Sequence, residues 1–304
     1  MNILHILQQI GQADPEVFDR LDSRRAAMRQ FSSLGKKVAV AAVPLAFGTM
    51  IQKAYGGVNE SALLVLNYAL SLEHLEADFY TRAVNANNAP TPAALAALTK
   101  IRDDERAHVT FLQNAIRSAG GTPAAANANG YDFTGALGGN RTALFPNPFA
   151  AGNYGTLLAI AQALEDTGVR AYKGRAPELK QTDYLAAALQ IHSVEARHAA
   201  HIRSMRRALI GATEPKSWVQ GATGATNGSL PAETDAVYGM GAAFEALPAS
   251  TFPAETNTVQ GGVETRGLGN VNGQTEGANA AAESFDEALD KNTVLAIAGN
   301  FIVP

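Results

Sequence analysis

The sequence predicts an all-α protein, with a four-helix bundle at its centre, an N-terminal arm and an irregular C-terminal extension. Three observations predict this class. Residues 58–210 are rich in Ala and Leu, and their apolar residues recur at helical spacing. Turns that carry Pro or Gly divide this region into four helices. The connection between the second and third helices, residues 119–152, is long, which is typical of bundles built from two hairpins joined by one crossover.

The first hairpin is expected to begin with a helix over about Glu60–Val84. A turn with two prolines follows, in which Thr91 has the position of an N-cap and Pro92 that of the first helical residue. The second helix then runs to about Ser118, before Gly120 and Gly121.

The second hairpin is expected to contain a third helix over about Asn153–Lys173 and a fourth over about Thr182–Leu209. Gly211 follows the fourth helix at the place where a glycine commonly ends one. The composition therefore predicts three parts: an arm over residues 1–57, the bundle over 58–210 and the extension over 211–304.

The N-terminal arm contains an apolar stretch, Val38–Ile51, which Pro44 and Gly48 interrupt. A membrane span needs about twenty apolar residues, so we expect no span here. The pair Arg24-Arg25 before this stretch resembles a twin-arginine export signal, but it lies far from the apolar run and no clean cleavage site follows. We expect a cytoplasmic protein; the alternative is the periplasm or cell envelope.

The C-terminal extension is rich in Gly, Ala, Asn and Thr and has little periodicity before its end. Ser284 and Glu287 have the spacing of a capping box, which predicts the start of a short terminal helix. We expect Trp218 and Tyr238 to pin the earlier part. An apolar cluster should anchor the end on the bundle or on a second subunit: Phe285, Leu289, Val294, Ile297, Phe301 and Ile302. This predicts a homo-oligomer in which the extension and Val38–Met50 pack against partner chains.

Composition excludes several classes of function. The 304 residues contain no Cys, which excludes disulfides, a thiol nucleophile, a Cys-ligated zinc site and an iron–sulfur cluster. The net charge of -4 argues against a nucleic-acid partner.

Charged residues lie at core positions of all four predicted helices. Apolar residues at steps of three and four mark the inner face of each helix, and a carboxylate interrupts each face near its middle. The four stripes are Ala62, Leu66, Ala69, Glu73, Glu76 and Tyr80; Leu98, Ile101, Glu105, His108, Leu112 and Ala115; Leu158, Ala161, Glu165, Gly168 and Tyr172; and Ala188, Ile191, Glu195, His198, Ile202 and Met205.

A buried carboxylate that lacks a partner costs several kcal/mol, and converging carboxylates also repel one another. Two divalent cations would balance four glutamates. A Glu-x-x-His pair places both side chains on one helical face, so each pair can offer two ligands to one metal. The predicted ligands are Glu73, Glu76, Glu105, His108, Glu165, Glu195 and His198. We expect them to converge on two metals about 3.5–4 Å apart.

The same pattern occurs in both hairpins. Glu73, Tyr80, Glu105 and His108 in the first match Glu165, Tyr172, Glu195 and His198 in the second. This predicts a pseudo-two-fold dimetal site, with the four matched glutamates and both tyrosines as the catalytic groups. We expect Glu73 to be the main ligand of the first helix, because only Glu73 matches Glu165 in the repeat; the alternative is that Glu76 is the main ligand or a bridging one. A single Glu-x-x-His is usually a solvated helix face, so the duplication carries the prediction.

Several polar residues near these motifs are not expected to bind the metals directly. Asp104 is either an acceptor that orients a histidine across the site or part of a solvated face. Arg106 and Arg197 should point outward, and surface or boundary positions are expected for His74, His192 and His201.

The segment Leu66–Tyr80 resembles the first helix of the bacterial ferritin-like family that includes desiccation-related proteins. The two Glu-x-x-His motifs fit the wider ferritin-like superfamily, with manganese catalase, rubrerythrin and bacterioferritin as relatives. The crossover segment Tyr131-Asp132-Phe133 and the ending Phe285–Asp290 are also similar to that family.

The resemblance implies a ferritin-like bundle with a di-iron or di-manganese carboxylate centre. It implies an oxidoreductase that takes a small substrate, peroxide or dioxygen, and most simply a catalase-like protein that removes peroxide in the response to stress. The alternatives are a ferroxidase or iron-handling protein, and a stress-related assembly protein whose metals are structural. Rubrerythrin-like reduction needs an electron donor, and this chain has no Cys-ligated module to supply one.

Overall fold

The computed structural model describes residues 60–180, 182–211, 215–241, 243–244, 247–266, 270–271, 274–275 and 278–304. These belong to one compact unit, Ala54–Pro304. The predictions for the arm over residues 1–57, its apolar stretch and its export signal lie outside the described residues. Among the described helices, none combines the length and the apolar character that crossing a bilayer requires.

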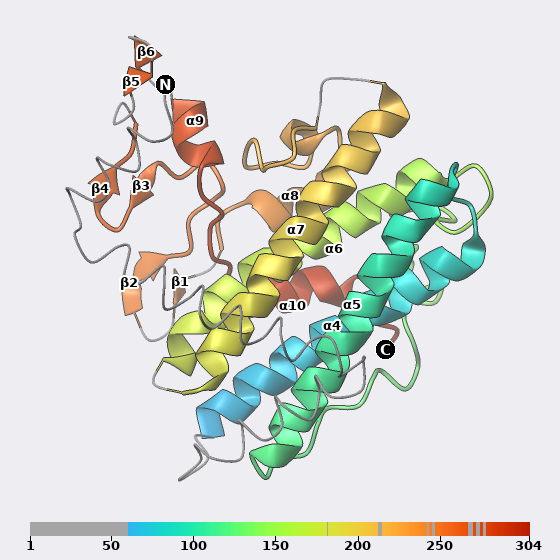
Figure 1. Ribbon diagram of the computed structural model, residues 1–304, viewed down its shortest axis with the longest axis horizontal. Coiled ribbons are helices and arrows are strands. Elements are labelled where there is room, and N and C mark those ends of the chain that lie inside the picture. The colour runs from blue at the N-terminus through green and yellow to red at the C-terminus, as the bar shows by residue number, and fades with distance from the viewer. Residues whose placement is uncertain are drawn as a thin grey trace, which may run out of the picture. The chain divides into compact units, whose positions relative to one another are not determined.

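Four long helices form two antiparallel hairpins, as predicted (Figure 1). Helix α4 (Glu60–Ala86) packs on α5 (Pro92–Ser118), and α6 (Tyr154–Arg175) packs on α7 (Tyr184–Ile210). A short 3-10 turn, η1 (Ala176–Leu179), joins α6 to α7. Each predicted helix boundary lies within about two residues of the observed one, the usual uncertainty of such boundaries.

Local chemistry sets two of these boundaries. The Thr91 hydroxyl accepts a hydrogen bond from the Ala94 amide at 3.1 Å, and Pro92 follows as the first helical residue. Gly211 ends α7 in the left-handed region, at φ 63°. The inner stripes are buried as predicted, except that Met205 is only half-buried.

The long crossover between α5 and α6 meets the C-terminus of the chain. Tyr131 forms an isolated antiparallel bridge with Ile302, and the Asp132 amide donates to the Phe301 carbonyl at 2.7 Å. Phe133 and Phe145 pack beside the Phe301 ring. The crossover and the chain end therefore hold each other in place.

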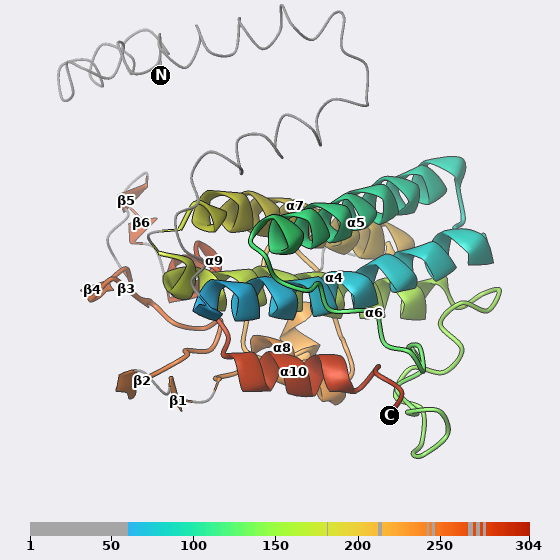
Figure 2. The same cartoon turned by 90° about the horizontal axis from the view of Figure 1, so that it is seen from below.

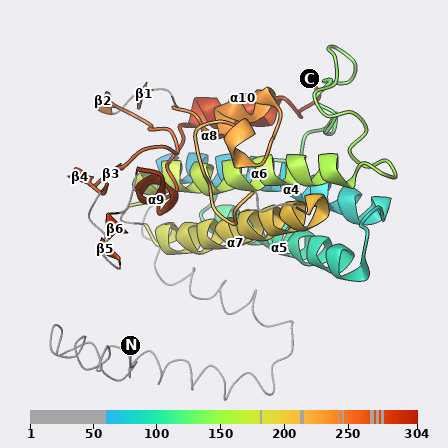
Figure 3. The same ribbon diagram turned by 90° about the horizontal axis from the view of Figure 1, so that it is seen from above.

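The C-terminal extension consists of short elements. In chain order they are η2 (Ala225–Asn227), η3 (Ala232–Thr234), α8 (Asp235–Tyr238), β1 (Ala243–Phe244), β2 (Leu247–Thr251), β3 (Val259–Gln260), β4 (Val263–Glu264), β5 (Asn270–Val271), β6 (Gln274–Thr275), α9 (Ala278–Glu283) and α10 (Lys291–Gly299). The strands form three separate antiparallel pairs, β1–β2, β3–β4 and β5–β6. Helices α8 and α10 pack on α6, on the side away from α5 and α7 (Figures 2 and 3).

Most of the predicted apolar anchor holds the extension on the bundle of its own chain. Leu289, Val294, Ile297 and Phe301 are buried there, and Tyr238 is fully buried. Docking on the bundle is thus confirmed for the described residues, and packing against a second subunit stays a prediction.

Three expectations for the extension are wrong. Phe285 is 39% exposed, and Trp218 is 48% exposed, with its indole N–H donating to Glu283. The capping box is absent from this part of the described chain, because the Ser284 hydroxyl donates back to the Ala280 carbonyl. Helix α10 begins later, and its N-cap is Asp290, which accepts from the Thr293 amide at 3.0 Å.

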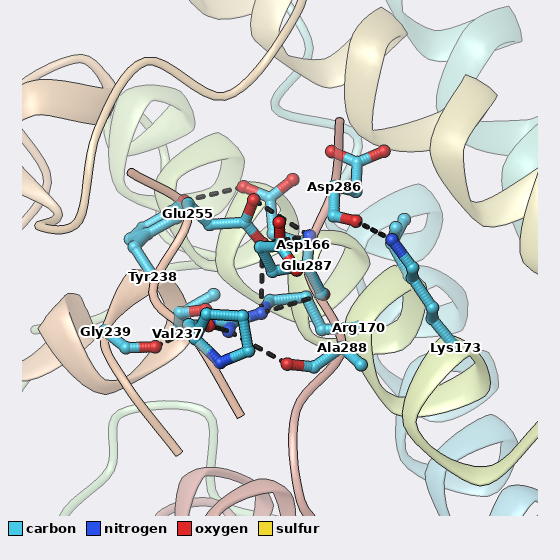
Figure 4. Close-up of polar contacts among 12 residues, drawn as sticks. Asp166, Arg170, Lys173, Val237, Tyr238, Gly239, Glu255, Asp286, Glu287 and Ala288 are labelled. Carbon is cyan, nitrogen blue, oxygen red and sulfur yellow. Dashed lines mark hydrogen bonds and ion pairs between the residues drawn. The ribbon is translucent and has the colours of Figure 1, made fainter. Parts of the chain in front are cut away.

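A fully buried arginine of α6, Arg170, fastens the extension to the bundle (Figure 4). Its Nε lies 3.0 Å from Glu255 Oε1. Its guanidinium also donates hydrogen bonds to five backbone carbonyls of the extension, those of Val237, Gly239, Pro253, Glu287 and Ala288. One side chain therefore satisfies backbone groups from three separate segments that no regular ladder serves.

Candidate metal centre

The seven predicted ligands converge inside the bundle, and none is more than 8% exposed. Each helix contributes at the middle of its inner face, where the stripe positions had placed a charge. The ligands are Glu73 and Glu76 on α4, Glu105 and His108 on α5, Glu165 on α6, and Glu195 and His198 on α7.

The side chains form two overlapping groups, each able to hold one cation. One group is Glu73, Glu105, His108 and Glu195; the other is Glu105, Glu165, Glu195 and His198. Within each group the ligand atoms lie within 4.8 Å of one another. Glu105 and Glu195 belong to both groups, so they lie between the two positions. Each position also has one glutamate and one histidine of its own.

The histidines hold the two groups together. His108 Nδ1 lies 3.0 Å from Glu105 Oε2 and 3.2 Å from both Glu73 Oε2 and Glu195 Oε1. His198 Nδ1 lies 2.8 Å from Glu105 Oε1 and 3.4 Å from Glu165 Oε2. Each imidazole therefore faces Glu105, which both groups share, and a second carboxylate that belongs only to its own group. We call the carboxylates that belong to a single group, Glu73 and Glu165, the terminal carboxylates.

The tyrosines link the two hairpins in a symmetric manner. The Tyr80 hydroxyl donates to Glu165 Oε1 at 2.5 Å, and the Tyr172 hydroxyl donates to Glu73 Oε1. Burial, followed by the charge of the neighbouring glutamate, raises the pKa of both phenols well above 10.0. Both hydroxyls therefore keep their protons and orient one terminal carboxylate each.

Glu76 breaks the symmetry. Its counterpart in the repeat is Gly168, where a Cβ atom would lie 3.4 Å from Glu76 Oε1 and 3.3 Å from Glu195 Oε2. The missing side chain of Gly168 thus leaves the room that the fifth carboxylate occupies. Glu76 belongs to neither group of ligands, whereas Glu73 shares a group with His108. In the sequence, this difference is visible as a mismatch in the repeat, where Gly168 occupies the position that corresponds to Glu76.

Burial makes these charges costly. It raises the pKa of Glu76, Glu165 and Glu195, and repulsion from neighbouring carboxylates raises the pKa of Glu76 and Glu195 further. Burial alone would lower the pKa of His198, but the charge of Glu165 and the close contact with the Glu105 carboxylate outweigh it and raise the pKa to about 11. The pKa of His108 is raised in the same way, by Glu105, Glu195 and Glu73.

The residues fit a pair of metal ions. Several buried atoms of the cluster lie close to a charged neighbour but make no hydrogen bond of good geometry among the described residues: Glu105 Oε1, Glu165 Oε2, both Glu195 oxygens and His198 Nδ1. Such buried groups are costly unless something pairs with them. Carboxylate and imidazole ligands suit both manganese and iron, so the donor set does not select between the two.

The sequence left open whether Asp104 orients a histidine or lies on a solvated helix face, and the structure favours the first alternative. Asp104 Oδ2 lies 3.2 Å from His198 Nε2, and Lys100 pairs with the same carboxylate. Burial opposes the charge, but hydrogen bonds with Lys100 and His198 outweigh it and lower the pKa of Asp104. Asp104 is therefore ionised and orients His198 from the outer side. The equivalent residue in α7 is Val194, which offers no acceptor.

The remaining polar residues lie where the sequence predicted. Arg106, Arg197 and His201 are exposed. His74 and His192 are half-buried, and their rings contact the backbone carbonyls of Ala124 and Val169.

Comparison with known proteins agrees with this geometry. The family model of the ferritin-like domain matches residues 61–208, which span all four bundle helices. No curated protein matches the chain. The resemblance to the desiccation-related family stays a prediction. By its fold and by this match, residues 61–208 form a ferritin-like domain.

Proposed function

We propose that this domain binds two redox-active metal ions, manganese or iron, and acts as an oxidoreductase that removes hydrogen peroxide. The observation that carries the proposal is the membership of Glu105 and Glu195 in both ligand groups. Two cations held by these groups would share carboxylates and act as a pair, which a two-electron reaction needs.

The residues of the two groups divide between two metal positions, and their charges match two divalent ions. Glu73 and His108 would complete one metal site, and Glu165 and His198 the other, with Glu105 and Glu195 between them. Those four carboxylates balance two divalent ions. Glu76 is a fifth carboxyl group beside the shared glutamates, and its raised pKa suits it to hold a proton there and so to remain neutral.

Disproportionation of peroxide fits a chain without cysteine. One hydrogen peroxide molecule loses two electrons and two protons to become dioxygen. A second molecule gains two electrons and two protons to become two water molecules. The bound metals would supply the redox change, storing two electrons between the two half-reactions. The balance needs no outside reductant, which matters because the chain holds no thiolate module that could pass electrons in.

The protein's own side chains would keep the centre in one geometry. Tyr80 and Tyr172 each fix one terminal carboxylate through a hydroxyl that remains protonated. Asp104 fixes the ring of His198 through its outer nitrogen. Burial of all seven ligands excludes bulk water and strengthens each of these contacts.

The test measures metal content and oxygen evolution on the purified full chain. We expect two manganese or iron ions per chain and oxygen release from added peroxide. Glu105→Gln and Glu195→Gln should each lose metal and activity, because each removes a ligand that both positions share. Glu233→Gln, at an exposed glutamate of the extension, is the matched control and should change neither.

Three outcomes would contradict the proposal. A chain that binds no metal would remove its basis. Two bound ions with rapid oxidation of ferrous iron, but no consumption of peroxide, would assign a ferroxidase instead. Two bound ions with neither activity would make the metals structural.

A further inference from the structure

An apolar pocket lies inside the bundle on one side of the metal centre. Residues from all four helices line it, among them Leu66, Ala69, Leu112, Tyr172 and Ala188. The surface they present is entirely apolar. Two of the longer side chains have their polar ends engaged elsewhere: Arg175 pairs with Glu178 at 2.6 Å, and the Tyr172 hydroxyl donates to Glu73. The hydroxyl of a third, Tyr68, is buried without a hydrogen-bond partner among the described residues, but it presents no polar surface to the pocket.

The pocket adjoins the ligands directly. Leu72 of its wall precedes Glu73, Leu112 follows His108 by four residues, and Ile191 precedes Glu195 by four. Four residues of helix correspond to about 6 Å along the axis. The ring of Tyr172 lies in the wall while its hydroxyl contacts the metal cluster, so one side chain separates the two spaces.

The size and surface of the pocket select its occupant. The centre of a water-sized molecule can move through about 20 Å³ here, slightly more than the roughly 10–15 Å³ that a single water needs. Water needs two to four polar partners, and hydrogen peroxide also depends on hydrogen bonds, so this surface favours neither. A hydrocarbon chain is too large. A small apolar molecule fits, and dioxygen is the one that a redox metal pair consumes or releases.

We propose that this pocket is a dioxygen site beside the metal centre. The inference rests on the proposed redox function, because dioxygen is either the product of peroxide disproportionation or the oxidant of ferrous ions. Two apolar residues of the pocket wall, Phe111 of α5 and Ala187 of α7, are half-buried. Dioxygen would enter or leave past these apolar side chains, while peroxide and water would reach the cluster near the polar residues Asp104 and His198.

The binding test uses xenon, a monatomic apolar probe, on the full chain. We expect xenon to bind in the pocket, as seen by xenon NMR shifts and in crystals under xenon pressure. Ala188→Leu should abolish binding by filling the space. Leu66→Ala should strengthen binding by enlarging it, and this second variant guards against a filled variant that fails to fold. Ala96→Leu, the same substitution at an exposed position of α5, should leave xenon binding unchanged.

The kinetic test identifies the source of the dioxygen. If dioxygen arrives as an oxidant, Ala188→Leu slows oxidation of the ferrous-loaded protein by dissolved oxygen. If dioxygen leaves as a product, the same variant slows oxygen evolution from peroxide while metal content stays at the wild-type level. Either result supports the site.

Two results overturn the dioxygen site. One is absence of xenon from the wild-type pocket; the other is xenon binding with both rates unchanged in Ala188→Leu. Failure of the proposed function is distinguishable, because it appears as missing metal or missing turnover in the wild type, whereas the xenon measurement needs neither.

Discussion

Replacing Arg170 by Met should release the C-terminal extension while leaving the bundle folded. Met keeps a long apolar side chain on α6 but removes every donor. The guanidinium hydrogen bonds to the five carbonyls measure 2.5–3.2 Å, and no other described contact replaces them. The variant therefore leaves five backbone acceptors of the extension without their donor.

The magnitude follows from these contacts. Each hydrogen bond contributes about 1 kcal/mol net, so the five together contribute about 5 kcal/mol. The carboxylate of Glu255 adds little to this loss, because burial already raises its pKa to about 8 despite the Arg170 charge 3.0 Å away. In the variant, the Glu255 carboxylate can take up a proton, so it need not remain as an unpaired charge in the interior. A loss of about 5 kcal/mol equals the whole stability of a marginal domain, about 5–15 kcal/mol.

The single tryptophan makes the assay selective. Trp218 lies in the extension, so its fluorescence reports that part, while far-ultraviolet circular dichroism is dominated by the bundle helices. In urea, the Arg170→Met fluorescence transition should move to lower concentration and separate from the dichroism transition. Arg117→Met, at an exposed position of α5, is the matched control and should leave both transitions in place. Coincident, unshifted transitions in Arg170→Met would refute the role of this arginine.

Three further predictions concern the metal ligands and the extension. Because burial and carboxylate repulsion raise the pKa of Glu76 and Glu195 above 4.5, the chelator-treated protein binds more protons folded than unfolded above that pH. Its unfolding free energy should thus fall as the pH rises above 4.5, and added Mn²⁺ should reverse the trend with release of protons; a flat urea midpoint without metal would contradict this. Asp104→Asn should weaken binding of one of the two ions by about 10–100-fold in calorimetric titrations, whereas Asp103→Asn, at the exposed neighbouring position, should not. Ending the chain after Leu209 should expose the α6 face that Leu289 and Val294 cover and cause aggregation in size-exclusion chromatography; a soluble product with the oligomeric state of the full chain would show that the extension has no assembly role.

The bundle and its site were predictable because both depend on local spacing. A period of three and four residues identifies the inner face of each helix, and a charged residue on that face is visible without knowing any contact. Thr91, Pro92 and Gly211 mark helix ends by their own backbone chemistry. The duplicated Glu-x-x-His motif then relates one hairpin to the other, which predicted matching ligands from the two hairpins. The spacing alone did not predict that Tyr80 and Tyr172 each contact the glutamate of the other hairpin.

The extension was less predictable because its order comes from distant contacts. Arg170 gives no periodic signal, and its partners lie 67 to 118 residues away along the chain. The apolar character of Phe285 and Trp218 suggested burial, yet both remain partly exposed around a polar space that Asp166, Arg203 and Glu283 also line. Ser284 and Glu287 have the spacing of a capping box, but the Ser284 hydroxyl donates instead to the backbone carbonyl of Ala280 in α9, a contact that only the folded chain reveals.

The most direct test of the metal pair is anomalous diffraction from crystals of the full chain, with data collected on both sides of the manganese and iron absorption edges. We expect two adjacent anomalous peaks within the bundle, one beside Glu73 and His108, the other beside Glu165 and His198, with Glu105 and Glu195 between them. A single peak, or no peak among these residues in crystals grown with both metals present, would contradict it.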